Sequence, residues 1–318
     1  MNVTKEGNKA INEAENGSVL TTIEGLSAVT VIGLGMLGNA LANAFLKEGH
    51  RTTVWNRSLS KGQDLIANGA LRAADVAEAL SASPVVVICV SEYDSVRETL
   101  TPYSDFLSGR TLVNLSSGTP EQAREMSKWV SSLGAEYLDG AAMSGTRLVG
   151  RPEALFLYSG SPSAFTAHQS LLKSLGEATH LGEDPGLASL YDTALYGMNW
   201  GVLSGFFHAV SLVGKEVDAS TFAAVATAYL PFVTSLMTDY SHQIEDGHYP
   251  NGEGTLDIHA GAIDHLIHTS QANGIRIDVP SLFKTLIDRG IAAGHGSNGI
   301  ASVYEVIKTQ TVYEEEQV

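Results

Sequence analysis

The sequence is poor in cysteine and in basic residues. Cys89 is the one cysteine among 318 residues, so the chain cannot form an internal disulfide or a cysteine cage for zinc or an iron–sulfur cluster. The 19 Lys and Arg residues are outnumbered by 35 Asp and Glu residues, which gives a formal net charge of −16. A chain this acidic is a poor match for nucleic acid or for an anionic membrane surface. With so little cysteine, we expect a cytoplasmic protein.

The polar residues 1–27 lack the basic start and the apolar run of a secretory signal peptide. We therefore expect a loose N-terminal extension there, and a solvated acidic tail over residues 314–318. Hydrophobic residues make up 44% of the sequence, which is ample for a core. At ~150 residues per domain, the length suggests about two domains.

One long stretch is almost free of charge. Residues 186–213 carry a single formal charge, Asp192, and are numerous enough to span a bilayer. Three polar residues interrupt the stretch: Asn199, Ser204 and His208. The nearest basic residues form no one-sided cluster. We therefore predict a buried helix over residues 187–213, and no membrane segment.

Short β-branched runs alternate with helical stretches in the first half of the chain. Strands are predicted over residues 28–32, 52–55, 84–90, 111–115, 136–138 and 154–158. Helices are predicted over residues 37–48, 59–68, 74–81, 95–106 and 121–133. This alternation is typical of an α/β fold with a parallel sheet and helices on both faces. Beyond residues 184–186 the strands largely stop, and further helices are predicted over residues 219–239, 258–273 and 280–293.

A glycine-rich turn joins the first predicted strand to the first predicted helix. Its residues Gly33-Leu34-Gly35-Met36-Leu37-Gly38 match the GxGxxG pattern. In such a turn the first glycine makes the tight bend and the second lets N–H groups approach a pyrophosphate. The third lets the helix pack close to the strand. A plain glycine turn is the alternative, but the strand–turn–helix context favours dinucleotide binding.

The end of the second predicted strand indicates which dinucleotide binds. An NAD site usually has an acidic residue there, whereas this chain has Asn56-Arg57-Ser58. Arg57 can pair with a 2′-phosphate, Ser58 can donate to it, and Lys61 is close enough in sequence to assist. The alternative is that Arg57 is an exposed residue that flanks a helix. We predict NADPH/NADP+ as the cofactor.

Residues 33–58 resemble the opening of the β-hydroxyacid dehydrogenase superfamily. Later motifs resemble its imine reductase and reductive aminase branch: VNLSSGTP (113–120), LDGAAM (138–143), GRPEALFLYSG (150–160) and LYDTALYGMNWGVLSGFFHA (190–209). The resemblance covers residues 29–308. It implies a Rossmann-type NADP-binding domain (28–185), an interdomain helix (186–214), and an all-helical C-terminal domain for dimerisation and substrate binding (215–318).

The start of the interdomain helix separates the two branches. Hydroxyacid dehydrogenases carry a catalytic lysine there, but this chain has no Lys or Arg between Lys173 and Lys215. Asp192 resembles the active-site aspartate of the imine reductases. A carboxylate suits an iminium or ammonium group and is a poor partner for a substrate carboxylate. The alternative is a charge favoured by the helix dipole near the helix N-terminus.

The resemblance implies further site residues. Cofactor contacts are expected at Val90, Ser91, Ser116 and Ser117, and substrate-pocket positions at Tyr196, Trp200, Phe232, Ile258, His259 and Glu92. For the last five of these positions the implication is weaker. Relatives usually have Asp or Asn in place of Glu92, some have Tyr in place of Trp200, and packing explains the remaining three equally well. Ser144 retains part of the hydroxyacid dehydrogenase substrate motif. No histidine spacing indicates a metal site.

The predicted interdomain helix also carries a ridge of small residues at Gly197, Gly201 and Gly205. Such a ridge allows another backbone to approach closely. A helix that is apolar on nearly all sides needs cover that a partner subunit can supply, so we expect a homodimer.

The resemblance therefore implies an NADPH-dependent imine reductase, which would transfer hydride to the C=N carbon of an imine or iminium to give an amine. Its small-molecule partner is a preformed imine, or an amine and a carbonyl compound if the enzyme is a reductive aminase. An NADP-dependent 3-hydroxyacid-type dehydrogenase is one alternative, and a non-catalytic NADP-binding protein is a second.

Overall fold

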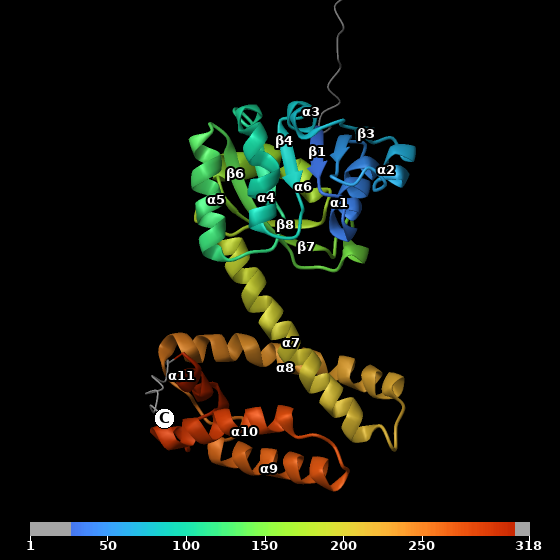
Figure 1. Ribbon diagram of the computed structural model, residues 1–318. Helices are drawn as coiled ribbons and strands as arrows, with labels where there is room; N and C mark the ends of the chain where they lie inside the picture. Colours follow the sequence, from blue (N-terminus) through green and yellow to red (C-terminus); the bar gives the residue numbers. More distant parts are fainter. Residues whose placement is uncertain (1–26, 309–318) are drawn as a thin grey trace, which may run out of the picture. The chain divides into compact units, whose positions relative to one another are not determined.

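The computed structural model describes residues 27–308 (Figure 1), so the expected extension, apart from Ser27, and the acidic tail lie outside the described residues. The chain divides into two compact units, and the division falls between Tyr196 and Gly197. All the strands found within residues 27–308 lie in the first unit, and the described part of the second unit is helical. The predicted fold class, a Rossmann-type α/β domain followed by a helical domain, is therefore confirmed.

The first unit contains one eight-stranded sheet with the strand order β3-β2-β1-β4-β5-β6-β7-β8. The strands are β1 (Ala28–Ile32), β2 (Arg51–Trp55), β3 (Leu71–Arg72), β4 (Val85–Ile88), β5 (Thr111–Asn114), β6 (Glu136–Ala142), β7 (Leu155–Gly160) and β8 (Glu177–His180). Neighbouring strands are parallel except for β6 and β7, which are antiparallel. The alternation in the sequence had suggested a parallel sheet. The antiparallel pairing of β6 and β7 is a departure from that prediction.

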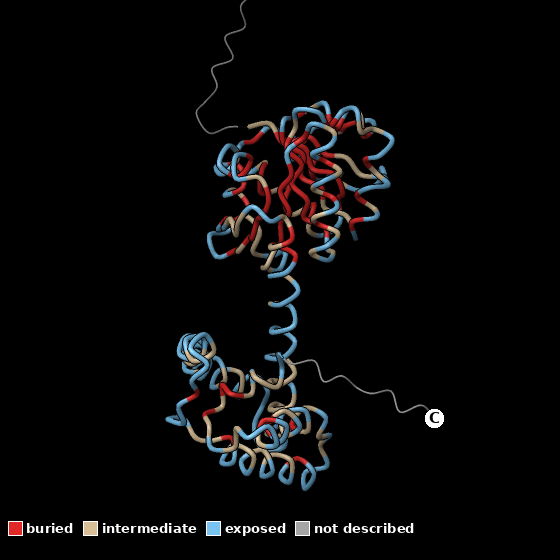
Figure 2. The backbone as a smooth tube through the Cα atoms, turned by 90° about the vertical axis from the view of Figure 1, so that its left-hand side faces the viewer, coloured by how far each residue is buried: buried red, intermediate tan, exposed pale blue. Residues whose placement is uncertain are grey.

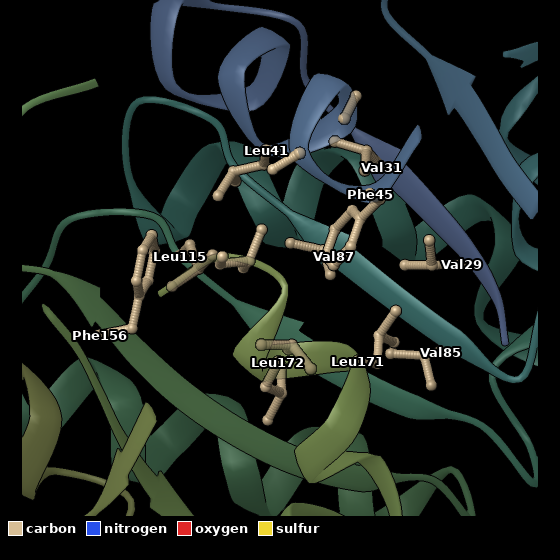
Figure 3. Close-up of a cluster of buried hydrophobic side chains, with 14 of the residues drawn as sticks. Val29, Val31, Leu41, Phe45, Val85, Val87, Leu115, Phe156, Leu171 and Leu172 are labelled. Carbon is tan, nitrogen blue, oxygen red and sulfur yellow. The ribbon is translucent and has the colours of Figure 1, made fainter. Parts of the chain in front are cut away.

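Helices cover both faces of this sheet. They are α1 (Met36–Lys47), α2 (Gln63–Ala67), α3 (Val76–Ser81), α4 (Tyr93–Leu100), α5 (Pro120–Ser132) and α6 (Pro162–Lys173), with short 3-10 turns η1 (Thr101–Phe106) and η2 (Thr146–Leu148). Alternate strand residues enter two separate cores, because successive side chains point to opposite faces. Val85 and Val87 pack with α1 and α6 (Figure 3), whereas Val86 and Ile88 pack with α3, α4 and α5.

The second unit is built from helices. Its elements are the later part of α7 (Leu187–Val213), then α8 (Ala219–Asp246), α9 (Leu256–Ala272), α10 (Asp278–Gly290), the π-helical turn η3 (Ile291–His295), η4 (Ile300–Val303) and α11 (Tyr304–Ile307). Buried residues are dense in the sheet and sparse in these helices, as Figure 2 shows. Among the described residues, α8 alone is long and apolar enough to cross a membrane, by length and composition only.

Several elements differ from the prediction. The predicted bounds of α7 are confirmed. The prediction that this helix is buried is wrong for a single copy of the chain, because only Ala188 and Ser189 of α7 are buried. The helix expected over 59–68 shrinks to α2, since Gly62 adopts φ +80° immediately before it. Residues 101–106 form η1 instead of extending α4, and Pro102 in this turn has no N–H for a further helical hydrogen bond. Strand β8 and helix α6 were not predicted.

Candidate active site

The glycine turn between β1 and α1 has the geometry that its sequence predicted. Gly33 adopts φ +94°, and a Cβ atom there would lie 2.2 Å from the Cys89 carbonyl oxygen. A Cβ atom on Gly38 would lie 1.9 Å from the Gly33 carbonyl oxygen, so α1 packs directly on the turn. A Cβ atom on Gly35 would meet nothing within 4 Å. The turn is therefore closely packed on the protein side and open on the other.

Helix α1 begins without a capping side chain and has no acidic residue in its first turn. Its first N–H groups are thus left for an external acceptor, and the positive end of the helix dipole adds to the attraction for an anion. A pyrophosphate fits such a helix N-terminus. Both the free backbone N–H groups at the start of α1 and the glycines of the preceding turn therefore suit a dinucleotide site.

A cleft of about 610 Å³ opens beside this turn. It brings together most of the predicted cofactor residues: Gly33, Leu34, Gly35, Met36, Leu37, Asn56, Arg57, Ser58, Lys61, Val90, Ser91 and Ser117. Its lining also includes residues that sequence reasoning missed: Trp55, Cys89, Ser95, Glu98, Thr99, Leu115 and Thr146. Two predicted residues, Gly38 and Ser116, do not line it. Gly38 packs under the turn, and Ser116 is buried.

At one end of the cleft lie the residues predicted to hold a 2′-phosphate. The guanidinium group of Arg57 is exposed and forms no ion pair within residues 27–308. Asn56 shapes this region, because its Oδ1 accepts a hydrogen bond from the Leu34 N–H (2.9 Å) and its Nδ2 donates to the Ser58 carbonyl (3.1 Å). Asn56 thus ties the glycine turn to the segment that presents Arg57 and Ser58.

The other end of the cleft follows β4 and β5. Ser116 Oγ accepts a hydrogen bond from the Val90 N–H (3.0 Å), and a backbone bridge joins Glu92 to Ser117. Ser116 thus links the loop after β5 to the loop after β4. Glu92 is exposed, occupies the N-cap position of α4 without a capping hydrogen bond, and does not line the cleft. Burial raises the pKa of the Cys89 thiol to about 11.

Asp192 lies in the second turn of α7, still within the first unit. Its carboxyl group is half-buried and has no hydrogen-bond or ion-pair partner among residues 27–308. Burial raises the pKa of this carboxyl group above its usual value, as its apolar neighbours predict. An unpartnered, partly desolvated carboxyl group is costly to keep, so this feature is typical of a functional site.

The remaining predicted substrate residues lie along α7, α8 and α9. Tyr196 and Trp200 on α7 are 60% and 52% exposed, and Phe232 on α8 contacts Tyr229 with its ring. Ile258 at the start of α9 is 64% exposed. Their place in a substrate pocket stays a prediction.

Two polar residues outside the cleft are occupied by local hydrogen bonds. His259 Nε2 lies 3.1 Å from the Glu253 carbonyl oxygen, and Ser144 Oγ accepts a hydrogen bond from the Leu155 N–H (2.9 Å). Within the described part of the chain, no group of three or more His, Cys, Asp and Glu side chains is placed to hold a metal ion.

Comparisons with known proteins agree with this geometry. Residues 28–182 match the NAD binding domain of 6-phosphogluconate dehydrogenase, and residues 184–309 match a C-terminal domain described as NADPH-dependent reductive aminase-like. An NADPH-dependent reductive aminase from Aspergillus oryzae is 35% identical over 288 residues, which cover 88% of this chain and 97% of that protein.

Solved structures give the same result. A reductive aminase from Aspergillus terreus in complex with NADPH4, cyclohexanone and allyl amine is 34% identical, with a TM-score of 0.83 over 89% of this chain and 99% of that one. An imine reductase from Streptomyces aurantiacus is 32% identical, with a TM-score of 0.85 over 89% of this chain and 100% of that one.

Proposed function

The chain belongs to the imine reductase and reductive aminase family, and from this premise we propose that it reduces the C=N bond of small imines at the expense of NADPH. The single observation that carries the proposal is Asp192. Its half-buried carboxyl group has no partner among residues 27–308, and it lies near the start of a helix that has no lysine, where a hydroxyacid dehydrogenase would carry one.

The cofactor cleft fits NADPH. The open side of Gly35 and the uncapped start of α1 would receive the pyrophosphate. Arg57, which has no ion-pair partner within the described residues, would hold the 2′-phosphate together with Ser58 and Lys61. NADPH, when bound, supplies the hydride for the C=N carbon. The task of this chain is to bind and orient the two reactants and to favour the charge on the substrate nitrogen.

Asp192 would perform the second part of that task. As a carboxylate it stabilises an iminium nitrogen through a charge-assisted hydrogen bond, and as a carboxylic acid it can donate a proton to a neutral imine. A raised pKa makes the protonated form more accessible near neutral pH than for an exposed aspartate. Trp200 and Phe232 would add apolar surface for the substrate.

We further infer that the enzyme accepts an amine and a carbonyl compound as separate substrates. The relative from Aspergillus terreus was solved with a ketone and an amine together, and it aligns with almost the whole of the described chain. The carboxyl group of Asp192 suits this chemistry too, because it can hold the amine as its ammonium ion or take up a proton from it.

We also propose a homodimer, located in the cytoplasm. Large apolar side chains on α7 and α8 are exposed, including Phe207 (54%), Val225 (65%) and Tyr229 (59%). A Cβ atom built on Gly201 meets nothing within 4 Å, so the small-residue ridge has no packing partner within the described chain. A second copy that covers these helices would bury the apolar surface in an obligate interface.

The experiment that tests the function compares two reactions in parallel. NADPH consumption is followed with a five-membered cyclic imine, and NADP+ reduction is followed with a 3-hydroxyacid. We expect turnover in the first assay only. Turnover of the hydroxyacid alone would favour the dehydrogenase alternative, and cofactor binding without turnover in either assay would favour a non-catalytic NADP-binding protein.

A further inference from the structure

A buried carboxyl group, Asp139 on β6, lies at the centre of a polar network in the first unit. It is fully buried and accepts hydrogen bonds from three hydroxyl groups. Tyr93 and Tyr137 donate to Oδ1, the latter at 2.9 Å, and Ser189 donates to Oδ2 at 2.7 Å. A buried carboxylate is tolerated only when it is paired or well hydrogen-bonded, and these donors meet that requirement.

The register of β6 and β7 places Asp139 beside a second residue that binds the start of α7. Asp139 pairs directly with Ser159 across these antiparallel strands. Ser159 Oγ accepts a hydrogen bond from the Ala188 N–H (2.9 Å) and donates one to the Pro185 carbonyl (2.9 Å). Because Asp139 binds Ser189, two facing strand residues hold two consecutive residues at the start of α7.

Tyr93 connects the same carboxyl group to the cofactor cleft. It is the first residue of α4 and follows Ser91, which lines the cleft, by two positions. Its ring is buried against Gly118, where a Cβ atom would lie 2.2 Å from a ring carbon. The ring has little room to move, so its hydroxyl group is a fixed donor to Asp139.

Asp192 follows Ser189 by three residues on α7. Residues three apart on a helix lie on nearly the same face, about 4.5 Å apart along the axis. We propose that Asp139 is a positioning residue: by binding Tyr93 and Ser189 together, it fixes the first turn of α7, and with it the Asp192 carboxyl group, relative to the loop that lines the cofactor cleft.

The charge state of the network is consistent with this role. Burial raises the pKa of Asp139 to about 6, while the hydrogen bonds from Tyr93, Ser189 and Tyr137 oppose that rise. At neutral pH the group is therefore mainly ionised. An ionised carboxylate accepts all three hydroxyl hydrogen bonds at once, and such charge-assisted bonds are stronger than neutral ones.

The inference rests on the proposed function, because it needs Asp192 to act on the substrate. Two conservative variants remove single hydroxyl groups: Ser189→Ala and Tyr93→Phe. Two matched controls do the same elsewhere. Ser211→Ala removes a hydroxyl group bonded only to its own helix, and Tyr158→Phe removes a buried hydroxyl group that has no partner among the described residues.

We expect Ser189→Ala and Tyr93→Phe to lower kcat for imine reduction by about tenfold, since a small displacement of a catalytic group has effects of this order. The Kd for NADPH should change by less than about twofold, because the cofactor contacts are intact. Both control variants should keep the kcat of the parent protein. Unchanged kcat in both Ser189→Ala and Tyr93→Phe would overturn the inference.

The closing experiment repeats Ser189→Ala in an Asp192→Asn background. If Ser189 acts through Asp192, the second substitution should lower kcat by less than about twofold there, because effects on one catalytic unit are not additive. An equal loss in both backgrounds would show independent action and overturn the inference alone. Full activity of Asp192→Asn by itself would overturn the proposed function, and the positioning role with it.

Discussion

Asp139 and Ser159 face each other across β6 and β7, and each binds a residue at the start of α7. This pairing depends on the one antiparallel contact in the sheet. Reversal of β7 places a serine beside the buried aspartate, with both side chains on the face that receives α7. The two hydrogen bonds that fix the start of α7, the helix that carries Asp192, therefore depend on the sheet topology.

The buried Asp139 predicts a specific pH dependence of stability. Its pKa in the folded protein, about 6, lies above the ordinary value of 3.8, so the folded state binds more protons than the unfolded state between these values. This contribution to stability is present below pH 4 and is lost as pH rises through 6. Asp139→Asn removes it.

Relative to Asp139→Asn, the parent protein should lose about 2 kcal/mol of unfolding free energy between pH 4 and pH 7. Denaturant unfolding of both proteins at a series of pH values measures this difference. A difference that stays constant over this range would show that the pKa of Asp139 is not raised in the folded state.

We predict that a substitution of Tyr158 stabilises the protein. Its hydroxyl oxygen is buried and has no hydrogen-bond partner within residues 27–308, and burial raises the pKa of the phenol. Tyr158→Phe removes an unsatisfied polar group and keeps the ring, so the unfolding free energy should rise by about 1 kcal/mol. Chemical denaturation of both proteins checks this. A loss of stability would mean that the hydroxyl group is satisfied in solution.

Arg57 predicts the choice of cofactor. Arg57→Ala should weaken NADPH binding by about ten- to a hundredfold, the effect of losing a charge-assisted hydrogen bond, and leave NADH binding nearly unchanged. Arg51→Ala is a matched control, because Arg51 is an exposed arginine at the opposite end of β2. Fluorescence titrations measure both cofactors. An equal loss for NADPH and NADH would show that Arg57 does not bind the 2′-phosphate.

The glycine ridge of α7 allows a test of the proposed homodimer. If α7 forms the interface, Gly201→Leu should leave the protein monomeric, since a bulky side chain cannot enter a close backbone contact. Gly201→Ala is the control for the helix itself, because alanine favours the helix by about 1 kcal/mol over glycine. Sedimentation equilibrium gives the mass of each variant. A parent protein that is an active monomer at all concentrations would contradict the prediction.

The sequence predicted most reliably those features that depend on a short, continuous segment of the chain. The GxGxxG turn predicts its own backbone, because the close contacts of Gly33 and Gly38 leave no room for a side chain. The acid-free end of β2 and the isolated Asp192 likewise stand out without a structure. The start of α6 is also marked in the sequence, because Ser161 caps the helix and Pro162 occupies its first position.

What the sequence could not predict depends on pairing between distant segments. Asp139 appears in a strand motif with nothing to indicate its partners, which come from α4, β6 and α7. The direction of β7 determines that Ser159 lies beside it, and no local pattern encodes that direction. The expected burial of α7 was wrong within residues 27–308, because the apolar composition of a helix does not show which segment covers it.

The central claim is that Asp192 acts on the substrate nitrogen. Asp192→Asn keeps the shape of the side chain but removes its charge and its exchangeable proton. The decisive measurement is steady-state imine reduction by this variant and the parent protein, with the Kd for NADPH measured on both. We predict a fall in kcat/KM of about 10²- to 10⁴-fold, typical of a lost acid–base group, with NADPH binding unchanged. Normal imine reduction by Asp192→Asn would contradict the account.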